Sequence, residues 1–264
     1  MQIKTTDFRK PGINERAASF LCGILLLLII VITSTQAVCY WIPGWWHKEY
    51  AKYNTPQYVT GEMSLDDAVY ITEQMLDYCI GRIDTLDDTM ATIDGKSVPF
   101  FTEREKQHLA DCRNIFLGAV KVRVVSILVI IGLILAIYYS ARKRLELASG
   151  KPGSASQSEV WREVTPILAK GYIKALIAQL IFAAVLVLMG MQDFTLLFTR
   201  FHHVFFDNDL WILDPAVDNL VNVMQESVFS DAAIDIGLIS AGVAAILTVI
   251  SIVVLRKRKQ AAEA

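Results

Sequence analysis

The chain has 264 residues, of which 54% are hydrophobic and only 20% are charged, and its mean hydropathy is +0.42. This composition is too apolar for an ordinary soluble domain. The net charge of −2 gives no sign of a nucleic-acid partner, and we expect none.

Four long apolar stretches account for this composition. None of them contains a charged residue, and each is close to the roughly 20 residues that an α-helix needs to cross about 30 Å of hydrocarbon. Because a backbone amide in lipid must be satisfied within its own segment, helices are the expected form. The predicted membrane helices span about residues 17–38, 124–140, 175–191 and 236–255.

We therefore predict an all-α membrane protein in which residues 1–264 form a single integral membrane domain. An extracytoplasmic insert is expected between the first two membrane helices, at about residues 40–122, and an outer loop between the last two, at about residues 192–235. The first apolar stretch could also be a cleaved signal peptide. It is longer than a typical signal core and no clear small-x-small cleavage site follows it, so we interpret it as an anchor.

Charge predicts the orientation of these helices. If both termini and residues 141–174 are cytoplasmic, that side holds 15 Lys and Arg against 6 acidic residues, and the other side holds 10 basic and 21 acidic residues. Basic loops favour the cytoplasmic side, and the basic runs 142–144 and 256–259 adjoin helix ends. Both termini are therefore expected inside.

The predicted insert carries several local signals. Three clustered tryptophans follow the first helix and suit anchoring at a membrane interface, namely Trp41, Trp45 and Trp46. Ser64 and Asp67 have the spacing of a helix capping box, and an apolar rhythm of helical period follows them. The dipeptide at residues 94–95, Asp-Gly, is a turn signal and predicts a pair of short strands or loops.

A second capping-box pattern, formed by Thr102 and Glu105, predicts a helix that runs without a breaker into the second membrane helix. On the cytoplasmic side, residues 149–158 have the composition of a flexible connector. Residues 159–172, which follow it, are expected to lie partly on the inner membrane surface.

Three of the four cysteines are expected at or beyond the outer surface, where disulfides can persist. These are Cys39, Cys79 and Cys112. A bridge between Cys79 and Cys112 is one interpretation, and small buried residues are the other. The sequence leaves both open.

The segment EREKQHLADCR, residues 103–113, contains the first histidine of interest. On a helix Arg104, His108 and Asp111 or Cys112 share a face, so a neighbouring carboxylate could orient the imidazole. By spacing alone, a solvated helix with a surface histidine is the more ordinary interpretation.

The segment FHHVFFDNDLWILDPAVD, residues 201–218, is less ordinary. His202 and His203 lie side by side among phenylalanines, and acidic residues and Trp211 follow at once. The aromatic side chains favour an apolar pocket near the membrane surface, and the acids could adjust its charge.

The two histidine segments are expected to meet. At 1.5 Å per residue, His108 lies about 22 Å beyond Arg123, which marks the outer end of the second membrane helix. His202 lies about 16 Å beyond Met191, at the end of the third, if that segment is helical. The two imidazoles are therefore expected at similar heights above the membrane.

These segments resemble the family of lipoprotein intramolecular transacylases, which are bacterial integral membrane enzymes. The family pattern F-H-x-x-F-F, followed by Trp and then Asp-Pro, is matched by Phe201, His202, Phe205, Phe206, Trp211, Asp214 and Pro215. A family histidine precedes an Asp-Val-Lys-like triplet, as His108 precedes residues 111–113, where Cys112 departs from the usual valine. His203 fills an unspecified position, and an expected proline is missing near residues 224–226.

The resemblance implies an acyltransferase of the bacterial plasma membrane. The sn-2 O-acyl chain of a diacylglyceryl-cysteine lipoprotein would move to the cysteine α-amino group and give the lyso-form lipoprotein. The partners would be this lipoprotein and membrane lipid, presented at the extracytoplasmic side. Neither a cofactor nor a metal is implied.

The resemblance also implies catalytic roles for His108 and His202. An α-ammonium, with a pKa of about 7.7 to 8.0, must lose a proton before it attacks an ester, and imidazole, at about 6.5, is nearly matched to it. The departing alkoxide needs a proton in turn, so an acid/base pair is a sensible requirement. Which histidine is the base stays open.

Further residues are expected to bind or orient the substrate. They are Asp111, Phe205, Phe206, Asn208, Trp211 and Asp214. The carboxylates would orient the histidines, Trp211 or Asn208 would donate a hydrogen bond to the oxyanion, and the phenylalanines would line an acyl groove. The pair Asp214-Pro215 is at least as readily a simple turn.

Two rival interpretations assign the chain to other functional classes. One is a non-catalytic outer-face receptor or accessory subunit that uses residues 50–101 to bind a partner. The other is a metal-dependent hydrolase built on His108, His202, His203 and acids. Adjacent histidines rarely point the same way on a helix, so the sequence favours the hydrolase least.

Overall fold

The computed structural model describes residues 10–263. Four helices in it are long and apolar enough to cross a membrane: Ile13–Trp41, Glu103–Ser149, Gln157–Gln192 and Glu226–Ala261. Each contains one of the predicted membrane stretches. The prediction of an all-α membrane protein with four membrane-spanning helices is confirmed, with one small β-hairpin added.

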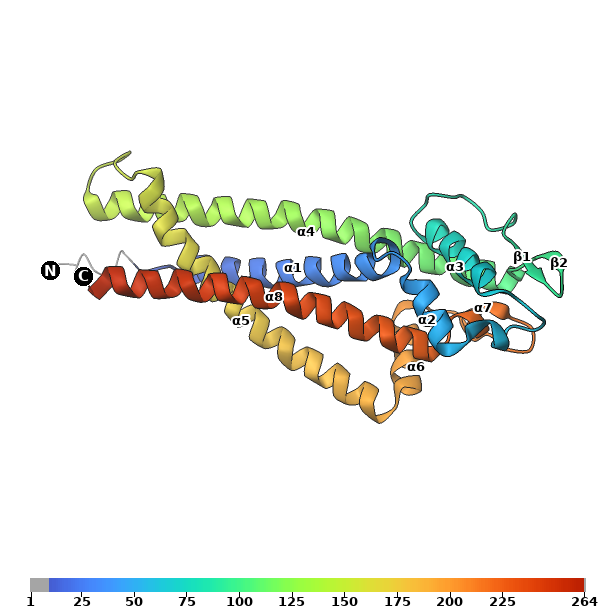
Figure 1. Ribbon diagram of the computed structural model, residues 1–264. Coiled ribbons are helices and arrows are strands. Elements are labelled where there is room, and N and C mark those ends of the chain that lie inside the picture. The colour runs from blue at the N-terminus through green and yellow to red at the C-terminus, as the bar shows by residue number, and fades with distance from the viewer. Residues whose placement is uncertain (1–9, 264) are drawn as a thin grey trace. The chain divides into compact units, whose positions relative to one another are not determined.

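The elements follow one another as Figure 1 labels them. They are α1 (Ile13–Gln36), a π-helical turn (Ala37–Trp41), α2 (Trp45–Tyr53), a 3₁₀ turn (Thr55–Tyr58), α3 (Leu65–Cys79), β1 (Met90–Ile93), β2 (Lys96–Pro99), α4 (Glu103–Ser149), α5 (Gln157–Gln192), α6 (Phe194–Phe205), α7 (Asn219–Val223) and α8 (Glu226–Glu263). Helix α4 has 47 residues, which is about 70 Å of helix and more than twice the thickness of the hydrocarbon layer. Its polar first turns therefore extend beyond the apolar stretch at 124–140.

The chain divides into two compact units. The first contains the described residues of 1–31, 123–185 and 239–264. In it α1 and α5 approach closely, since a Cβ built on Gly171 would lie 2.3 Å from the carbonyl oxygen of Ser19. Small residues let membrane helices pack in this way. The Tyr172 hydroxyl donates to the carbonyl of Ala244, 2.7 Å away, and so connects α5 to α8.

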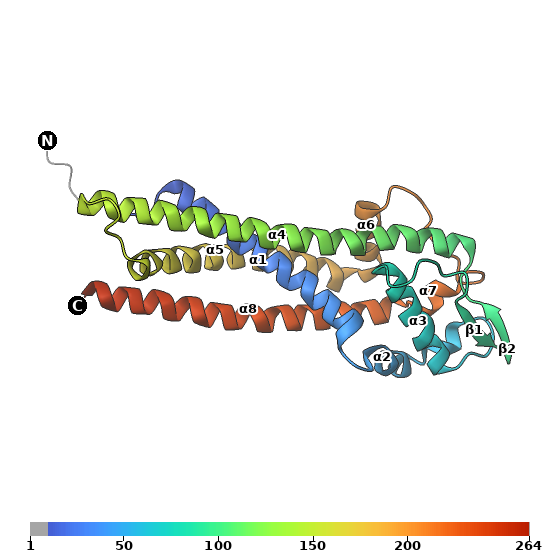
Figure 2. The same ribbon diagram turned by 90° about the horizontal axis from the view of Figure 1, so that it is seen from above.

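The second unit contains residues 32–122 and 186–238. Helix α3 lies beside both α2 and the β1–β2 hairpin (Figure 2). Tyr50 of α2 is fully buried, and its hydroxyl lies 2.6 Å from the Thr72 hydroxyl of α3. These contacts give the unit a core outside the membrane-spanning stretches.

Local signals in this unit form as predicted. The Ser64 hydroxyl accepts from the Asp67 amide at 3.0 Å and caps α3. Strands β1 and β2 pair antiparallel, and the turn between them has positive φ at Asp94 (51°) and Gly95 (71°). Such a turn requires two positive φ values, which Asp-Gly readily adopts. The predictions of a capped helix and of a turn at residues 94–95 are confirmed.

One prediction about the membrane surface is wrong. Trp45 is not an interface anchor, because it is only 4% exposed and its indole donates to the Asp235 carboxylate at 2.8 Å. Residues 159–172 do not form a separate element, and their position at the inner membrane surface stays a prediction. They form the first turns of α5, where Val160 and Val164 are buried against Ile137 of α4.

Candidate active site

The structure brings the two histidine segments together within the second unit. His108 lies one turn into α4, and His202 lies in the last turn of α6. Both side chains are buried, each 7% exposed. Their ring centroids are 6.1 Å apart and the ring planes are inclined by 33°. The predicted proximity of the two imidazoles is confirmed.

A capping box positions His108. The Thr102 hydroxyl accepts from the Glu105 amide at 3.2 Å, and the Glu105 carboxylate accepts from the Thr102 amide at 2.6 Å. This exchange satisfies amide groups that a helix start leaves without an intrahelical partner. The capping box therefore fixes the start of α4, the helix that carries His108.

Helix α6 is fixed in a similar way at its start. The Asp193 carboxylate accepts from the amide of Leu196 at 2.8 Å. At the other end of α6, Nδ1 of His202 lies 2.8 Å from the carbonyl oxygen of Phe198. Since a carbonyl only accepts, Nδ1 carries the proton and Nε2 of the neutral ring carries the lone pair.

Burial lowers the pKa of His202. The hydrogen bond to the Phe198 carbonyl favours the charged ring and partly opposes this effect, whereas the neighbouring His203 adds to it. His202 is therefore neutral at pH 7, with Nε2 free to accept a proton.

Aromatic rings surround the pair. Phe206 lies 5.1 Å from His108 and 5.5 Å from His202, measured between ring centroids. Trp211 stacks on His202, with centroids 4.8 Å apart and planes inclined by 30°. Phe198 lies 4.2 Å from His202 on centroids. The aromatic rings therefore make the surroundings of both imidazoles largely apolar.

Two buried nitrogen atoms at this site have no hydrogen-bond partner among the described residues. They are Nδ1 of His108 and Nε1 of Trp211. The other ring nitrogen of His108, Nε2, lies 3.6 Å from the sulfur of Cys112. Buried polar atoms without partners are uncommon in folded proteins, and a catalytic role is one explanation for them.

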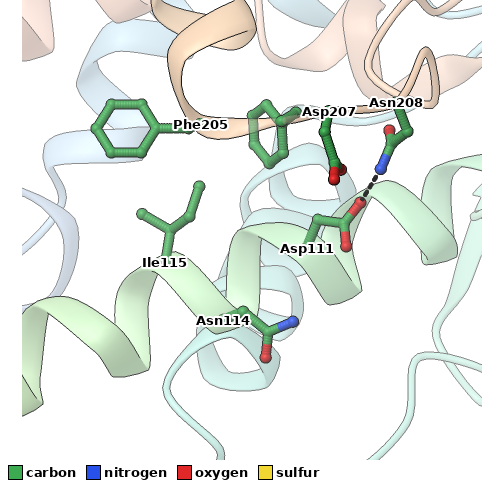
Figure 3. A pocket seen from close by; sticks show the side chains of 7 residues that line it. Asp111, Asn114, Ile115, Phe205, Asp207 and Asn208 are labelled. Atoms are coloured by element: carbon green, nitrogen blue, oxygen red, sulfur yellow. Dashed lines mark hydrogen bonds between the residues drawn. The ribbon is translucent and has the colours of Figure 1, made fainter.

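The second unit also contains a pocket of about 270 Å³, and Figure 3 shows the side chains that line it. Its lining comes from α4 and from the end of α6 with the residues after it: Asp111, Asn114, Ile115, Phe205, Phe206, Asp207 and Asn208. The Asn208 amide donates to the Asp111 carboxylate at 2.9 Å. Because Phe206 also contacts both imidazoles, the pocket lies next to the histidine pair.

Four of the six residues expected to bind substrate line this pocket: Asp111, Phe205, Phe206 and Asn208. A fifth, Trp211, contacts His202 directly. Asp214 is placed differently, since its carboxylate accepts from the Ala216 amide at 2.9 Å and its own amide donates to Asp218. This arrangement is the simple turn that the sequence also allowed.

His203 does not share the position of His202. Its side chain is exposed, and its ring meets the face of Trp211 edge-on, with centroids 5.1 Å apart. Among residues 10–263, no three His, Cys, Asp or Glu side chains lie where they could hold one metal ion. The four cysteines are free thiols, so the possible Cys79–Cys112 bridge is not formed.

Three residues that line the pocket, and the contact of Glu105 with α7, were not predicted from the sequence. Asn114 and Ile115 lie one helical turn beyond Asp111, a spacing that could have indicated them, and Asp207 directly follows Phe206. Glu105 was expected only as a cap. Its fully buried carboxylate also accepts from the amide of Leu220 at 2.5 Å, and so connects α4 to α7.

Comparisons with known proteins agree with this arrangement. Residues 20–229 match the family described as lipoprotein intramolecular transacylase Lit. The fold is similar to that of the membrane integral lipoprotein intramolecular transacylase Lit from Bacillus cereus, at 20% identity and a TM-score of 0.65, over 93% of this chain and 98% of that one.

Two further structures of the Bacillus cereus protein, in which one histidine is replaced by arginine or by alanine, are also similar. Each has 18% identity and a TM-score of 0.61. The match to the arginine variant covers 94% of this chain and 94% of that one, and the match to the alanine variant covers 93% and 96%. A comparison with curated protein sequences gave no significant match. At these identities the structural likeness shows the fold.

Proposed function

This chain belongs to the lipoprotein intramolecular transacylase (Lit) family, and we propose that it moves the sn-2 O-acyl chain of a diacylglyceryl-cysteine lipoprotein to the cysteine α-amino group. The product is the lyso-form lipoprotein. The observation that carries this proposal is the pair of buried imidazoles of His108 and His202, with centroids 6.1 Å apart.

The first step is removal of a proton from the α-ammonium group. Nε2 of His202 is the acceptor, because Nδ1 of the same ring is engaged with the Phe198 carbonyl. An ammonium group at a pKa of about 7.7 to 8.0 and an imidazole at about 6.5 differ by only roughly 2 kcal/mol in proton affinity. Burial lowers the pKa of His202, and an ammonium group bound in the same buried site would be shifted in the same direction, so the difference in proton affinity stays small.

The second step is attack of the neutral amine on the sn-2 ester carbonyl. The new C–N bond gives a tetrahedral intermediate whose oxygen carries a negative charge and whose nitrogen carries a positive charge. The buried N–H of Trp211 has no other partner among the described residues and donates to this oxygen. The stack of Trp211 on His202 holds the donor near the base.

The third step breaks the bond between the carbonyl carbon and the glyceryl oxygen. The departing alkoxide takes a proton from the imidazolium, and the nitrogen of the intermediate then gives its second proton to the neutral imidazole. The amide and the free glyceryl hydroxyl result, and the proton on the imidazole passes to solvent before the next turnover. Because two imidazolium charges 6.1 Å apart would repel, the pair carries one extra proton at a time. His108 therefore passes or shares that proton with His202. Since amine and ester belong to one molecule, the enzyme needs no acylated side chain.

The proposal includes an orientation in the membrane. The chain is a multi-pass membrane protein, and the excess of Lys and Arg at both termini and in residues 141–174 favours the cytoplasmic side for these parts. The histidine pair then faces the extracytoplasmic side of the bacterial plasma membrane, where lipoproteins are presented. Phe205 and Phe206 contact the acyl chains there.

Mass spectrometry of lipoprotein N-termini tests this function. The chain is expressed in a bacterial strain that lacks ordinary lipoprotein N-acylation, and the lyso form is expected to appear. A double variant, His108→Ala with His202→Ala, serves as the control and is expected to leave diacyl N-termini only. Diacyl N-termini in cells whose membranes contain the unaltered protein would contradict the proposal.

A further inference from the structure

The pocket beside the histidine pair has two chemically different ends. In Figure 3 the side chains of Ile115 and Phe205 lie at one end, and the carboxylates of Asp111 and Asp207 turn toward the other. The two ends come from the same two segments, since α4 and the end of α6 with its following residues each contribute an apolar and an acidic side chain. A ligand that fits must therefore be apolar on one side and complementary to carboxylates on the other.

The acidic end selects for positive charge. The Asp111 carboxylate accepts one hydrogen bond, from the Asn208 amide at 2.9 Å. The Asp207 carboxylate has no hydrogen-bond or ion-pair partner among the residues that the structure describes. Neither Lys nor Arg is among the lining residues. An anionic headgroup or a free fatty acid would be repelled there, whereas an ammonium group would gain two acceptors.

The proposed reaction creates a need for such a counter-charge. A cationic amine has to enter a site where burial already disfavours the charged form of His202. Phe206 contacts both imidazoles and also lines the pocket, so the pocket adjoins the proton-transfer site. The Asp111 carboxylate interacts electrostatically with His108. Because ammonium and imidazolium both carry one positive charge, nearby carboxylates stabilise both and do not oppose the transfer between them.

We propose that Asp111 and Asp207 form the binding subsite for the protonated α-amino group of the lipoprotein. This inference rests on the proposed transacylase function and adds the recognition of the substrate's N-terminal charge to it. The ammonium group binds between the two carboxylates and then gives its proton to His202. Ile115 and Phe205, at the other end of the pocket, contact the glyceryl and acyl portions of the same molecule.

The test is a binding measurement that does not depend on turnover. The probe is a dialkylglyceryl-cysteinyl peptide, whose ether linkages cannot transfer an acyl group, in two forms: with a free α-amine and with an N-acetylated α-amine. Binding is measured on the full-length protein in detergent micelles. The unaltered protein is expected to prefer the free-amine form by about tenfold or more.

Conservative variants then assign the preference to the two carboxylates. Asp207→Asn and Asp111→Asn are each expected to reduce the preference to about threefold or less, and the double variant is expected to bind both forms alike. The Asn208 amide can still donate to an asparagine at position 111, so the local hydrogen bond is retained. Asp207→Glu is expected to keep the preference.

Asp88→Asn is the matched control. Asp88 is an exposed carboxylate between α3 and β1 and does not line the pocket, so its variant is expected to keep the full preference. An ethanolamine phospholipid added as a competitor distinguishes the two sources of a lipid-borne ammonium group. It is expected to compete weakly, and competition equal to that of the free-amine peptide would overturn the assignment to a lipoprotein.

Equal binding of both peptide forms by the unaltered protein would overturn the subsite, and so would an unchanged preference in the double variant. The proposed function is tested separately with an ester-linked peptide. If the unaltered protein transfers acyl groups but binds both peptide forms alike, the proposed function stands and the proposed subsite is wrong. If it prefers the free amine but leaves the ester-linked peptide unchanged, the subsite stands and the proposed function is wrong.

Discussion

The indole ring of Trp211 stacks on the imidazole of His202, with centroids 4.8 Å apart. The stack covers one face of the imidazole, and the carbonyl of Phe198 engages its Nδ1. Only Nε2 is left for exchange of protons with a substrate. One aromatic contact and one backbone hydrogen bond thus define both the position and the tautomer of the proposed base.

Replacement of either central histidine is expected to abolish most activity. His202→Gln and His108→Gln should each lower kcat by about 100-fold or more, because each removes a group that moves a proton in the reaction. The double variant should be little worse than the singles, since the two residues act as a unit. Acyl transfer to the amine of a synthetic lipopeptide measures this. His203→Gln is the neighbouring control, and equal losses in all three single variants would contradict the assignment.

Loss of the Trp211 N–H alone is expected to slow the chemical step. Trp211→Phe keeps an aromatic ring for the stack on His202 but removes the donor, so kcat should fall by about 100-fold, with KM changed by less than about twofold. Steady-state kinetics separate the two constants. Trp46→Phe removes an indole donor that bonds to the Cys39 carbonyl, away from the histidines, and should leave kcat near its original value. An unaltered kcat in Trp211→Phe would exclude the oxyanion role.

Acidification is expected to destabilise the fold through His202. Its pKa in the folded protein is lowered from the usual value near 6.5, mainly by burial. The unfolded chain therefore binds a proton that the folded chain does not, and the stability from this group is present above about pH 6.5 and falls as the pH drops below it. Thermal unfolding in detergent from pH 7.5 to pH 5 should show a falling Tm. His202→Gln should show a smaller fall, and an identical slope in both proteins would refute this prediction.

The buried carboxylate of Glu105 is expected to stabilise the second unit. It accepts from the amides of Thr102 and Leu220, so Glu105→Ala leaves one part-buried and one buried donor without partners and should cost about 3 kcal/mol. Glu103, two residues earlier, forms an exposed pair with Lys106, and Glu103→Ala should cost less than about 1 kcal/mol. Denaturant unfolding in detergent compares the two variants. Equal stability of both would show that the contact between α4 and α7 contributes little.

Features with local signals could be predicted from the sequence. The four membrane helices follow from charge-free apolar stretches, and the starts of α3 and α4 follow from capping patterns within four residues. The turn of the hairpin follows from one dipeptide at residues 94–95. In each case the residues that determine the structure lie next to one another in the chain, so tertiary contacts do not have to be known.

Features that depend on distant partners could not be predicted. Trp45 is buried because Asp235, 190 residues later, accepts its indole hydrogen. Glu105 reaches the amide of Leu220 across 115 residues. The pairing of His108 with His202 was expected only because the predicted membrane boundaries put the two segments at similar heights and the family resemblance assigned both to one site. No local sequence pattern predicted that Asp207 would line the same pocket as Asp111.

The tight turn between β1 and β2 offers a practical consequence. Its two residues, Asp94 and Gly95, are exposed and belong neither to the pocket nor to the core of the unit. A short epitope inserted between them would add flexible chain at a loop tip, where insertions are well tolerated. Antibody labelling of such a tag in intact cells would then report directly which face of the bilayer carries this hairpin.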